Sequence, residues 1–198
     1  AVPTSATVTV TAGALRTGGF SVPGHGGSDA FSVANGATFE MSGTSVYPAS
    51  YTTYSYGTSS TVSYLQTGAT NIVGAAYGNL NAGTVSDSNA GVLYTISGNT
   101  SVAGVFTVGN ASSTNFDDLA LGSNTLTIAG TGTPFNMAKA LCSLANCGSG
   151  TVTYTDTSGG NTISIPGGIT YGNLNLGTAS DSNAADTFSL TSNGITIN

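Results

Sequence analysis

The sequence has very few charged residues. Charged side chains make up 5% of its 198 residues, whereas an ordinary soluble domain has about 25%. Arg16 and Lys139 are the only strong cations, His25 is the only histidine, and tryptophan is absent. Cations are needed to neutralise phosphates, so this composition argues against nucleic-acid binding and against a polybasic contact with a membrane surface.

Long apolar runs are also absent. No stretch of about 18 consecutive apolar residues occurs, so the sequence predicts no membrane span. The chain is nevertheless not of the disordered type, because 39% of its residues are hydrophobic and the net charge is only −6. Val, Ile, Leu, Phe and Tyr alternate with Thr and Ser, a mixture that fits a pleated, half-buried surface and favours β-structure.

The scarcity of ionisable groups argues against catalysis. Glycoside hydrolysis needs two carboxylates that flank one bond, but Asp117 and Asp118 are neighbours and would point to opposite faces of a strand. Asp87 and Asp181 lie in a repeated Ser-Asp-Ser-Asn motif that is typical of turns, and their loops lack the acid density of a calcium site. His25 stands alone in a glycine-rich loop. We therefore expect no enzyme activity, no cofactor and no metal site.

One segment has a helical pattern. Thr133 can cap a helix, Pro134 suits its first turn, and the apolar residues Met137, Ala138, Leu141 and Leu144 fall near one face. The sequence therefore predicts one short helix, which would pack as a lid on a sheet or at its edge.

The predicted helix carries the only two cysteines, Cys142 and Cys147. Two cysteines and a distant histidine do not make a zinc site, which needs four ligands. We predict a local disulfide, for which the helix must end between them, as Asn146 and Gly148 allow. The alternative is two buried thiols. A disulfide would place the protein outside the cytoplasm.

The chain contains an internal repeat. The motif Thr61–Tyr64 recurs 90 residues later as Thr151–Tyr154, and Tyr77–Asn81 recurs 94 residues later as Tyr171–Asn175. The change in offset indicates a four-residue insertion in the second copy. We predict a single repetitive β domain over residues 1–198, with units at roughly 61–150 and 151–198 and a partial unit at 1–60.

The local patterns are nearly all those of strands. Thr7–Thr11, Thr151–Tyr154 and Ile163–Ile165 alternate with a period of two, and glycine, asparagine and serine separate such short runs. The predicted fold is all-β, a parallel β-solenoid with one Cys-bearing helix. The alternative is a pilin-like β-sandwich whose first strand, Thr7–Thr11, inserts into a neighbouring copy by donor-strand exchange.

The repeated segments resemble those of a known group of proteins. Gly150–Tyr154, Tyr171–Leu176 and Leu121–Gly130 are similar to repeats in secreted parallel β-helix proteins, the filamentous-haemagglutinin-like and autotransporter-like adhesins. The resemblance covers residues 20–198 in patches. It implies a right-handed parallel solenoid, located outside the cell or at its surface and used for structure or adhesion. The chain departs from these proteins in its short length and its Cys-bearing helix.

The order of the repeats predicts self-assembly. A second, weaker repeat links Phe31–Asn35 to Phe106–Asn110, so the two kinds of repeat alternate, and joining the end of one copy to the start of the next preserves that alternation. We expect the chain to be a subunit that binds copies of itself head to tail in a filament, pilus-like fibre or sheath. The residues expected at the joint are Thr7, Val8, Thr9 and Val10 at one end and Ile195 and Ile197 at the other.

The alternative function is an adhesin fragment that binds glycans or surfaces. Tyr47, Tyr51, Tyr54 and Tyr56 lie close together and could stack on sugars, although tyrosines in sheets more often have a packing role. A Thr-rich ice-binding face is a remote third option, because the Thr-x-Thr spacing is irregular. Asn99 and Asn110 are followed by the residues that N-glycosylation requires, so both are candidate acceptors.

Overall fold

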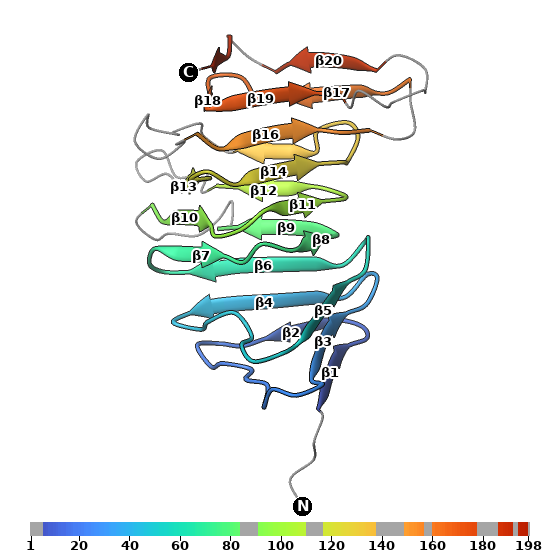
Figure 1. Cartoon of the computed structure of the whole chain (residues 1–198), viewed down its shortest axis with the longest axis vertical. Helices are drawn as coiled ribbons and strands as arrows, with labels where there is room; N and C mark the ends of the chain where they lie inside the picture. Colours follow the sequence, from blue (N-terminus) through green and yellow to red (C-terminus); the bar gives the residue numbers. More distant parts are fainter. Residues whose placement is uncertain are drawn as a thin grey trace, which may run out of the picture.

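The computed structural model describes residues 6–83, 91–109, 117–137, 149–156, 160–177, 186–191 and 194–197. This part of the chain is a parallel β-solenoid of about six turns and contains no helix. Figure 1 shows its strands stacked from the N-terminus at the bottom to the C-terminus at the top. Accordingly, the described residues contain no helix that could cross a membrane.

The described strands form six parallel sheets. The largest contains β2 (Ala14–Arg16), β4 (Thr38–Gly43), β6 (Thr61–Gln66), β9 (Asn79–Ala82), β12 (Phe106–Val108) and β15 (Phe135–Met137). The next contains β8 (Ala76–Tyr77), β11 (Thr100–Val102), β14 (Thr125–Ile128), β16 (Thr151–Tyr154) and β19 (Asn173–Leu176). Two three-stranded sheets contain β1 (Thr7–Val10), β3 (Ala30–Val33) and β5 (Thr53–Tyr56), and β7 (Thr70–Ile72), β10 (Leu93–Ile96) and β13 (Asp118–Ala120). The last two pair β17 (Thr162–Ile165) with β20 (Thr187–Leu190), and β18 (Thr170–Tyr171) with β21 (Thr196–Ile197).

Each turn has strands in different sheets, as consecutive strands β8, β9 and β10 show. Stacked residues lie 23 apart near the N-terminus, as for Thr9 and Ser32, and 25 apart further on, as for Val92 and Asp117. The pairing of β1 with β3 is parallel and lies within one chain. The β-sandwich alternative is therefore wrong, because a sandwich of that kind is built from antiparallel sheets.

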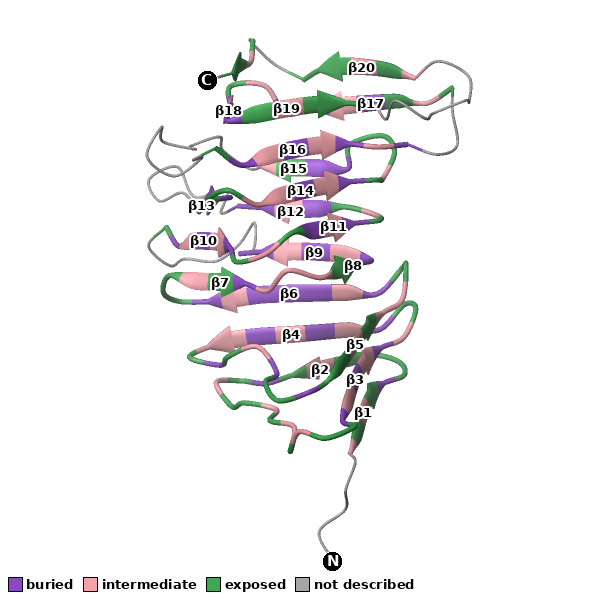
Figure 2. Cartoon of the chain, in the orientation of Figure 1, coloured by how far each residue is buried: buried purple, intermediate pink, exposed green. Residues whose placement is uncertain are grey.

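The core consists of inward side chains that stack from turn to turn. In the largest sheet one such ladder runs through Leu15, Phe39, Val62, Leu80, Phe106 and Phe135. The five members after Leu15 are at most 2% exposed, and the rings of Phe106 and Phe135 stack with centroids 5.3 Å apart. Figure 2 shows this buried interior along the central strands. Every turn thus covers the apolar side chains of the turn before it.

The outward side chains of the same strands are mostly uncharged and polar. Ser63, Asn81, Thr107 and Asn136 occupy successive turns of one outward ladder. The Asn81 amide Nδ2 donates a hydrogen bond of 3.1 Å to Ser63 Oγ. Neighbouring turns are therefore joined through outward-facing side chains as well as through the backbone.

The two copies of the sequence repeat pair in the same way. Thr61 of β6 stands opposite Asn79 of β9, and Thr151 of β16 stands opposite Asn173 of β19. In each copy the asparagine Nδ2 donates to a backbone carbonyl of the preceding turn, at 3.2 Å for Asn79 and 2.9 Å for Asn173. The copies lie in different sheets, so the repeat preserves local pairing and not the side of the solenoid.

The prediction of a helix is wrong where the structure can test it. Phe135–Met137 forms strand β15, which pairs with β12. The ring of Phe135 is 2% exposed and completes the core ladder, which outweighs the local helical pattern. Pro134 directly precedes this edge strand, where its missing N–H is tolerated. The remainder of the predicted helix, with Cys142 and Cys147, lies outside the described residues.

Candidate functional site

Three of the few acidic residues have the same structural position. Asp29, Asp117 and Asp186 each come directly before a strand, β3, β13 and β20 respectively. Each carboxylate accepts a hydrogen bond from the backbone N–H stacked beneath it, one turn earlier. The donors are Ala6 N at 2.5 Å, Val92 N at 2.8 Å and Asn161 N at 3.1 Å. These carboxylates therefore link successive turns.

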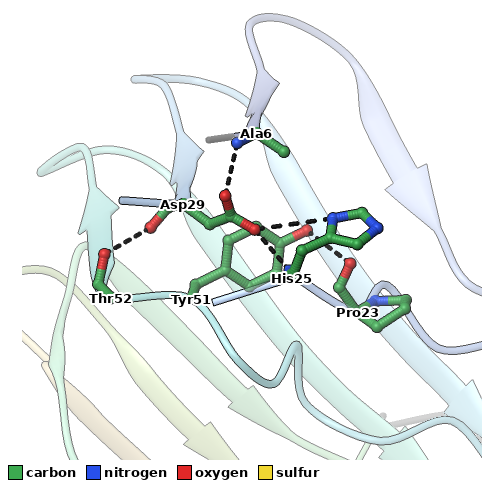
Figure 3. A network of polar contacts seen from close by, with 6 residues as sticks. All are labelled: Ala6, Pro23, His25, Asp29, Tyr51 and Thr52. Carbon is green, nitrogen blue, oxygen red and sulfur yellow. Dashed lines mark hydrogen bonds and ion pairs between the residues drawn. The ribbon is translucent and has the colours of Figure 1, made fainter. Parts of the chain in front are cut away.

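Figure 3 shows the first of these links, around Asp29. Its side chain is 1% exposed, and its second carboxylate oxygen accepts a hydrogen bond of 2.5 Å from the backbone N–H of His25. The hydrogen bonds from His25 and Ala6 hold the pKa of the Asp29 carboxyl below its usual value of 3.8, against the opposing effect of burial. His25 Nδ1 lies 3.8 Å from the same oxygen, but the imidazole is exposed. The arrangement fixes the loop before β3 against β1.

Two further acidic residues, Glu40 and Asp118, also have partners within the fold. Glu40 pairs with Arg16 at 3.2 Å on the surface. Asp118 Oδ1 accepts a hydrogen bond of 2.9 Å from the backbone N–H of its neighbour Leu119. Asp118 is partly exposed, whereas Asp117 is buried. Within the described ranges, no group of three or more His, Cys, Asp or Glu side chains is placed to hold a metal. Asp87 and Asp181 lie outside those ranges, and the absence of enzyme activity stays a prediction.

The tyrosines singled out in the sequence do come together. Tyr47 and Tyr54 lie with ring centroids 5.2 Å apart, Tyr51 packs edge-on against Tyr54 at 6.0 Å, and the hydroxyls of Tyr47 and Tyr56 form a hydrogen bond. Tyr51 is 8% exposed and belongs to the core. The packing role therefore accounts for a large part of this cluster.

Two further tyrosines, which were not predicted from the sequence, complete the cluster. Tyr64 and Tyr77 join their hydroxyls at 3.1 Å, and the ring of Tyr77 stacks on that of Tyr56 with centroids 5.1 Å apart. Burial raises the pKa of the Tyr47 hydroxyl to about 12 and those of Tyr56, Tyr64 and Tyr77 still further. All of these groups are therefore neutral at physiological pH.

A cavity of about 750 Å³ lies beside the tyrosine cluster, between the loop that follows β4 and the loop that follows β6. Tyr47 and Tyr54 form part of its wall, and Gln66 also lines it. Gln66 is 5% exposed, and its Nε2 donates to the backbone oxygen of Ser45 at 3.3 Å. Its Oε1 is buried and has no hydrogen-bond partner among the described residues. No sequence pattern pointed to this cavity, because its walls come from loops of different turns.

The last described turn leaves inward apolar side chains uncovered. Leu176, Leu190 and Ile197 are 45%, 47% and 54% exposed. They stack on Tyr154, Ile165 and Tyr171, which are at most 2% exposed. Figure 2 shows β19 and β20 mostly exposed, beyond the more buried strand β16. This end of the solenoid, formed by β19, β20 and β21, is called the open end below.

The residues predicted for the joint lie at the two ends. Thr7, Val8, Thr9 and Val10 form β1, one of the two edge strands of its sheet, with Val10 7% exposed. Ile195 packs partly buried against the core and Ile197 belongs to the open end. Val22, from the loop after β2, also packs against the core. The N-terminal end therefore presents the edge strands β1 and β2, and Phe20, in the loop after β2, is 79% exposed there.

Of the two candidate glycosylation sites, Asn99 lies among the described residues. Asn99 is exposed, and its Oδ1 accepts a hydrogen bond of 2.9 Å from Thr125 N in the next turn. Asn110 lies outside the described residues. Asn99 thus has a structural role of its own in joining turns.

Comparison with protein-family models, with curated proteins and with solved structures found no match.

Proposed function

We propose that this chain is a structural β-solenoid subunit, located outside the cell or at its surface, that stacks head to tail on copies of itself. The observation that carries the proposal is the open end, where Leu176, Leu190 and Ile197 are uncovered. Each of these side chains stands in an inward ladder that the next turn of a solenoid would continue.

The stacking energy has two sources. Covering a leucine or isoleucine side chain stabilises a contact by about 1.5–3 kcal/mol when burial is complete. Strands β19, β20 and β21 are edge strands within the described sheets, as are β1 and β2 at the other end. Parallel pairing of one copy's last turn with another copy's first turn would satisfy both edges, and such a heterologous contact produces open filaments.

The surface is compatible with close stacking. The chain has only 2 basic and 8 acidic residues, so copies meet little electrostatic repulsion. Several acids are already engaged in backbone hydrogen bonds, among them Asp29 and Asp117. The resemblance of the repeats to filamentous-haemagglutinin-like and autotransporter-like proteins supports the same placement outside the cell.

Electron microscopy and light scattering of the purified chain test the proposal. We expect filaments whose repeat corresponds to one subunit. Replacing two open-end residues together, Leu190→Lys and Ile197→Lys, should abolish them, because charges would enter the apolar contact. Val105→Lys is the matched control, since Val105 is an apolar residue 40% exposed on the side of the solenoid. Monodisperse monomers of the unmodified chain at high concentration would exclude the proposal.

Glycan or surface binding, as in an adhesin, is the second candidate. The observation in its favour is the cavity beside Tyr47 and Gln66.

A further inference from the structure

We propose that the cavity between the β4–β5 and β6–β7 loops is a binding site for a neutral sugar. Its volume of about 750 Å³ falls in the range of small-molecule sites, about 300–1,000 Å³. The site lies on the side of the solenoid, on residues 43–49, 54, 66–71 and 73, apart from the open end. The proposal therefore adds a binding function to the structural one and does not depend on it.

The charge of the lining selects an uncharged ligand. Among the described residues that line the cavity there is no Asp, Glu, Lys, Arg or His. Among the lining tyrosines, Tyr47 has a hydroxyl pKa raised to about 12 by burial, so it carries no charge at neutral pH. A charged ligand would lose its hydration without gaining an ionic partner, which costs free energy.

Gln66 provides a hydrogen-bond acceptor that none of the described residues uses. Its Nε2 faces the backbone oxygen of Ser45 at 3.3 Å. Rotating the amide by half a turn would bring two acceptor oxygens together, so this contact fixes which end of the amide is oxygen. Oε1 is consequently left buried without a partner. Because Oε1 is buried, a ligand can donate to it only after the Gln66 side chain turns Oε1 toward the cavity that the residue lines, and such a donor would then satisfy the acceptor.

The remaining walls suit a hydroxylated ring. The rings of Tyr47 and Tyr54 offer aromatic surface for the C–H faces of a sugar, and Tyr54 is held in place by its hydroxyl, which donates to Pro48 O at 2.8 Å. Thr70 and Asn71 add hydroxyl and amide groups to the lining. A fatty acyl chain would fill apolar space but leave Gln66 Oε1 unpaired, so the combination favours a sugar.

An array of immobilised neutral glycans tests the proposal, with sulfated and sialylated glycans on the same surface. We expect binding to neutral glycans, followed by titration calorimetry with the strongest binder. Gln66→Met removes the acceptor at similar side-chain volume and should weaken binding about tenfold. Ala69→Trp fills the cavity from an exposed position and should abolish binding. Ala103→Trp, also at an exposed position but outside the cavity, should bind as the unmodified chain does.

The outcomes separate the alternatives. Binding only to charged glycans, binding that survives Ala69→Trp, or no binding to any neutral glycan would each overturn the proposal. Uptake of a fluorescent fatty acid that Ala69→Trp blocks, without glycan binding, would also overturn it and assign the cavity to lipid. The filament-disrupting pair Leu190→Lys and Ile197→Lys should leave glycan binding unchanged, so the two proposals can fail separately.

Discussion

The carboxylate of Asp117 accepts a hydrogen bond of 2.8 Å from the backbone N–H of Val92, one turn earlier in the solenoid. Both residues are buried, at 1% and 3% exposure. Val92 comes directly before β10 and Asp117 directly before β13, so this bond continues the parallel ladder by one position beyond the strands. Asp29 and Asp186 repeat the arrangement at two other places. Three of the chain's few acids thus act as links between turns.

Removing such a link should destabilise the fold. We expect Asp117→Ala to lower the free energy of unfolding by about 2 kcal/mol, because a charge-assisted bond is lost and a buried N–H is left without it. Asp118→Ala is the matched control, since Asp118 is partly exposed and accepts a bond from its neighbour Leu119. Chemical denaturation measures both. Equal losses for the two variants would contradict a special role for Asp117.

The link at Asp29 should make stability depend on pH. Its carboxyl has a folded-state pKa below the usual value of 3.8, so the stabilisation is present above that value and is lost as the pH falls through the folded pKa. We expect Asp29→Asn to be less stable than the unmodified chain at neutral pH, with the difference shrinking at pH values below 3.8. Chemical denaturation of both chains at neutral pH and again below pH 3.8 measures this difference in stability. A difference that does not change with pH would show that ionisation of the Asp29 carboxyl is not its cause.

Much of the fold could be predicted because it is encoded locally. The period-two alternation of Thr151–Tyr154 became β16, with Val152 and Tyr154 buried, and Ile163–Ile165 became most of β17. The prediction of a helix around Phe135 was wrong for the opposite reason, because the structure there is determined by a distant contact. Its strand conformation depends on Phe106, a core partner many residues away, and the local pattern of a capped helix contains no trace of that contact.

The candidate sites were harder to predict for the same reason. Whether Asp29 lies over Ala6 depends on the length of the turn between them, and turns differ in length, with stacked residues 23 apart here and 25 apart at Asp117. Part of the tyrosine cluster could be predicted from the sequence, because four of its members are close together in the chain: Tyr47, Tyr51, Tyr54 and Tyr56. Tyr64 and Gln66 enter the same region only through the stacking of β4 on β6.

The repeat motif also contains a glycine that the packing requires. A Cβ atom at Gly78 would lie 2.7 Å from the backbone oxygen of Ser60 and closer still to that of Gly57. We expect Gly78→Ala to lower the free energy of unfolding by about 2–3 kcal/mol, because neither backbone can move without disturbing the ladder. Gly68→Ala is the control, because no described atom lies within 4 Å of the position that its new methyl group would occupy. It should change stability by less than about 1 kcal/mol; a larger loss at Gly68 than at Gly78 would refute this account.

The buried tyrosines should make the fold sensitive to alkali. Burial raises the pKa of the Tyr47 hydroxyl from 10.0 to about 12, so the folded state holds its proton where the unfolded chain releases it. The stabilisation is therefore complete below pH 10 and is lost as the pH rises from there towards the folded pKa. One pH unit above 10 the loss due to Tyr47 should be roughly 1 kcal/mol. Tyr47→Phe cannot ionise and should lack this part of the loss.

Denaturation at neutral pH and again above pH 10 measures the effect, with tyrosinate absorbance as a direct record of ionisation. At neutral pH the substitution removes the hydrogen bond to Tyr56, so the variant should be the less stable of the two chains. Above pH 10 the difference in the free energy of unfolding between the two chains should become smaller or change sign. The reason is that only in the unmodified chain is the unfolded state stabilised by ionisation of Tyr47. A gap between the two chains that stays constant across this range would mean that Tyr47 ionises as readily in the folded state as in the unfolded one.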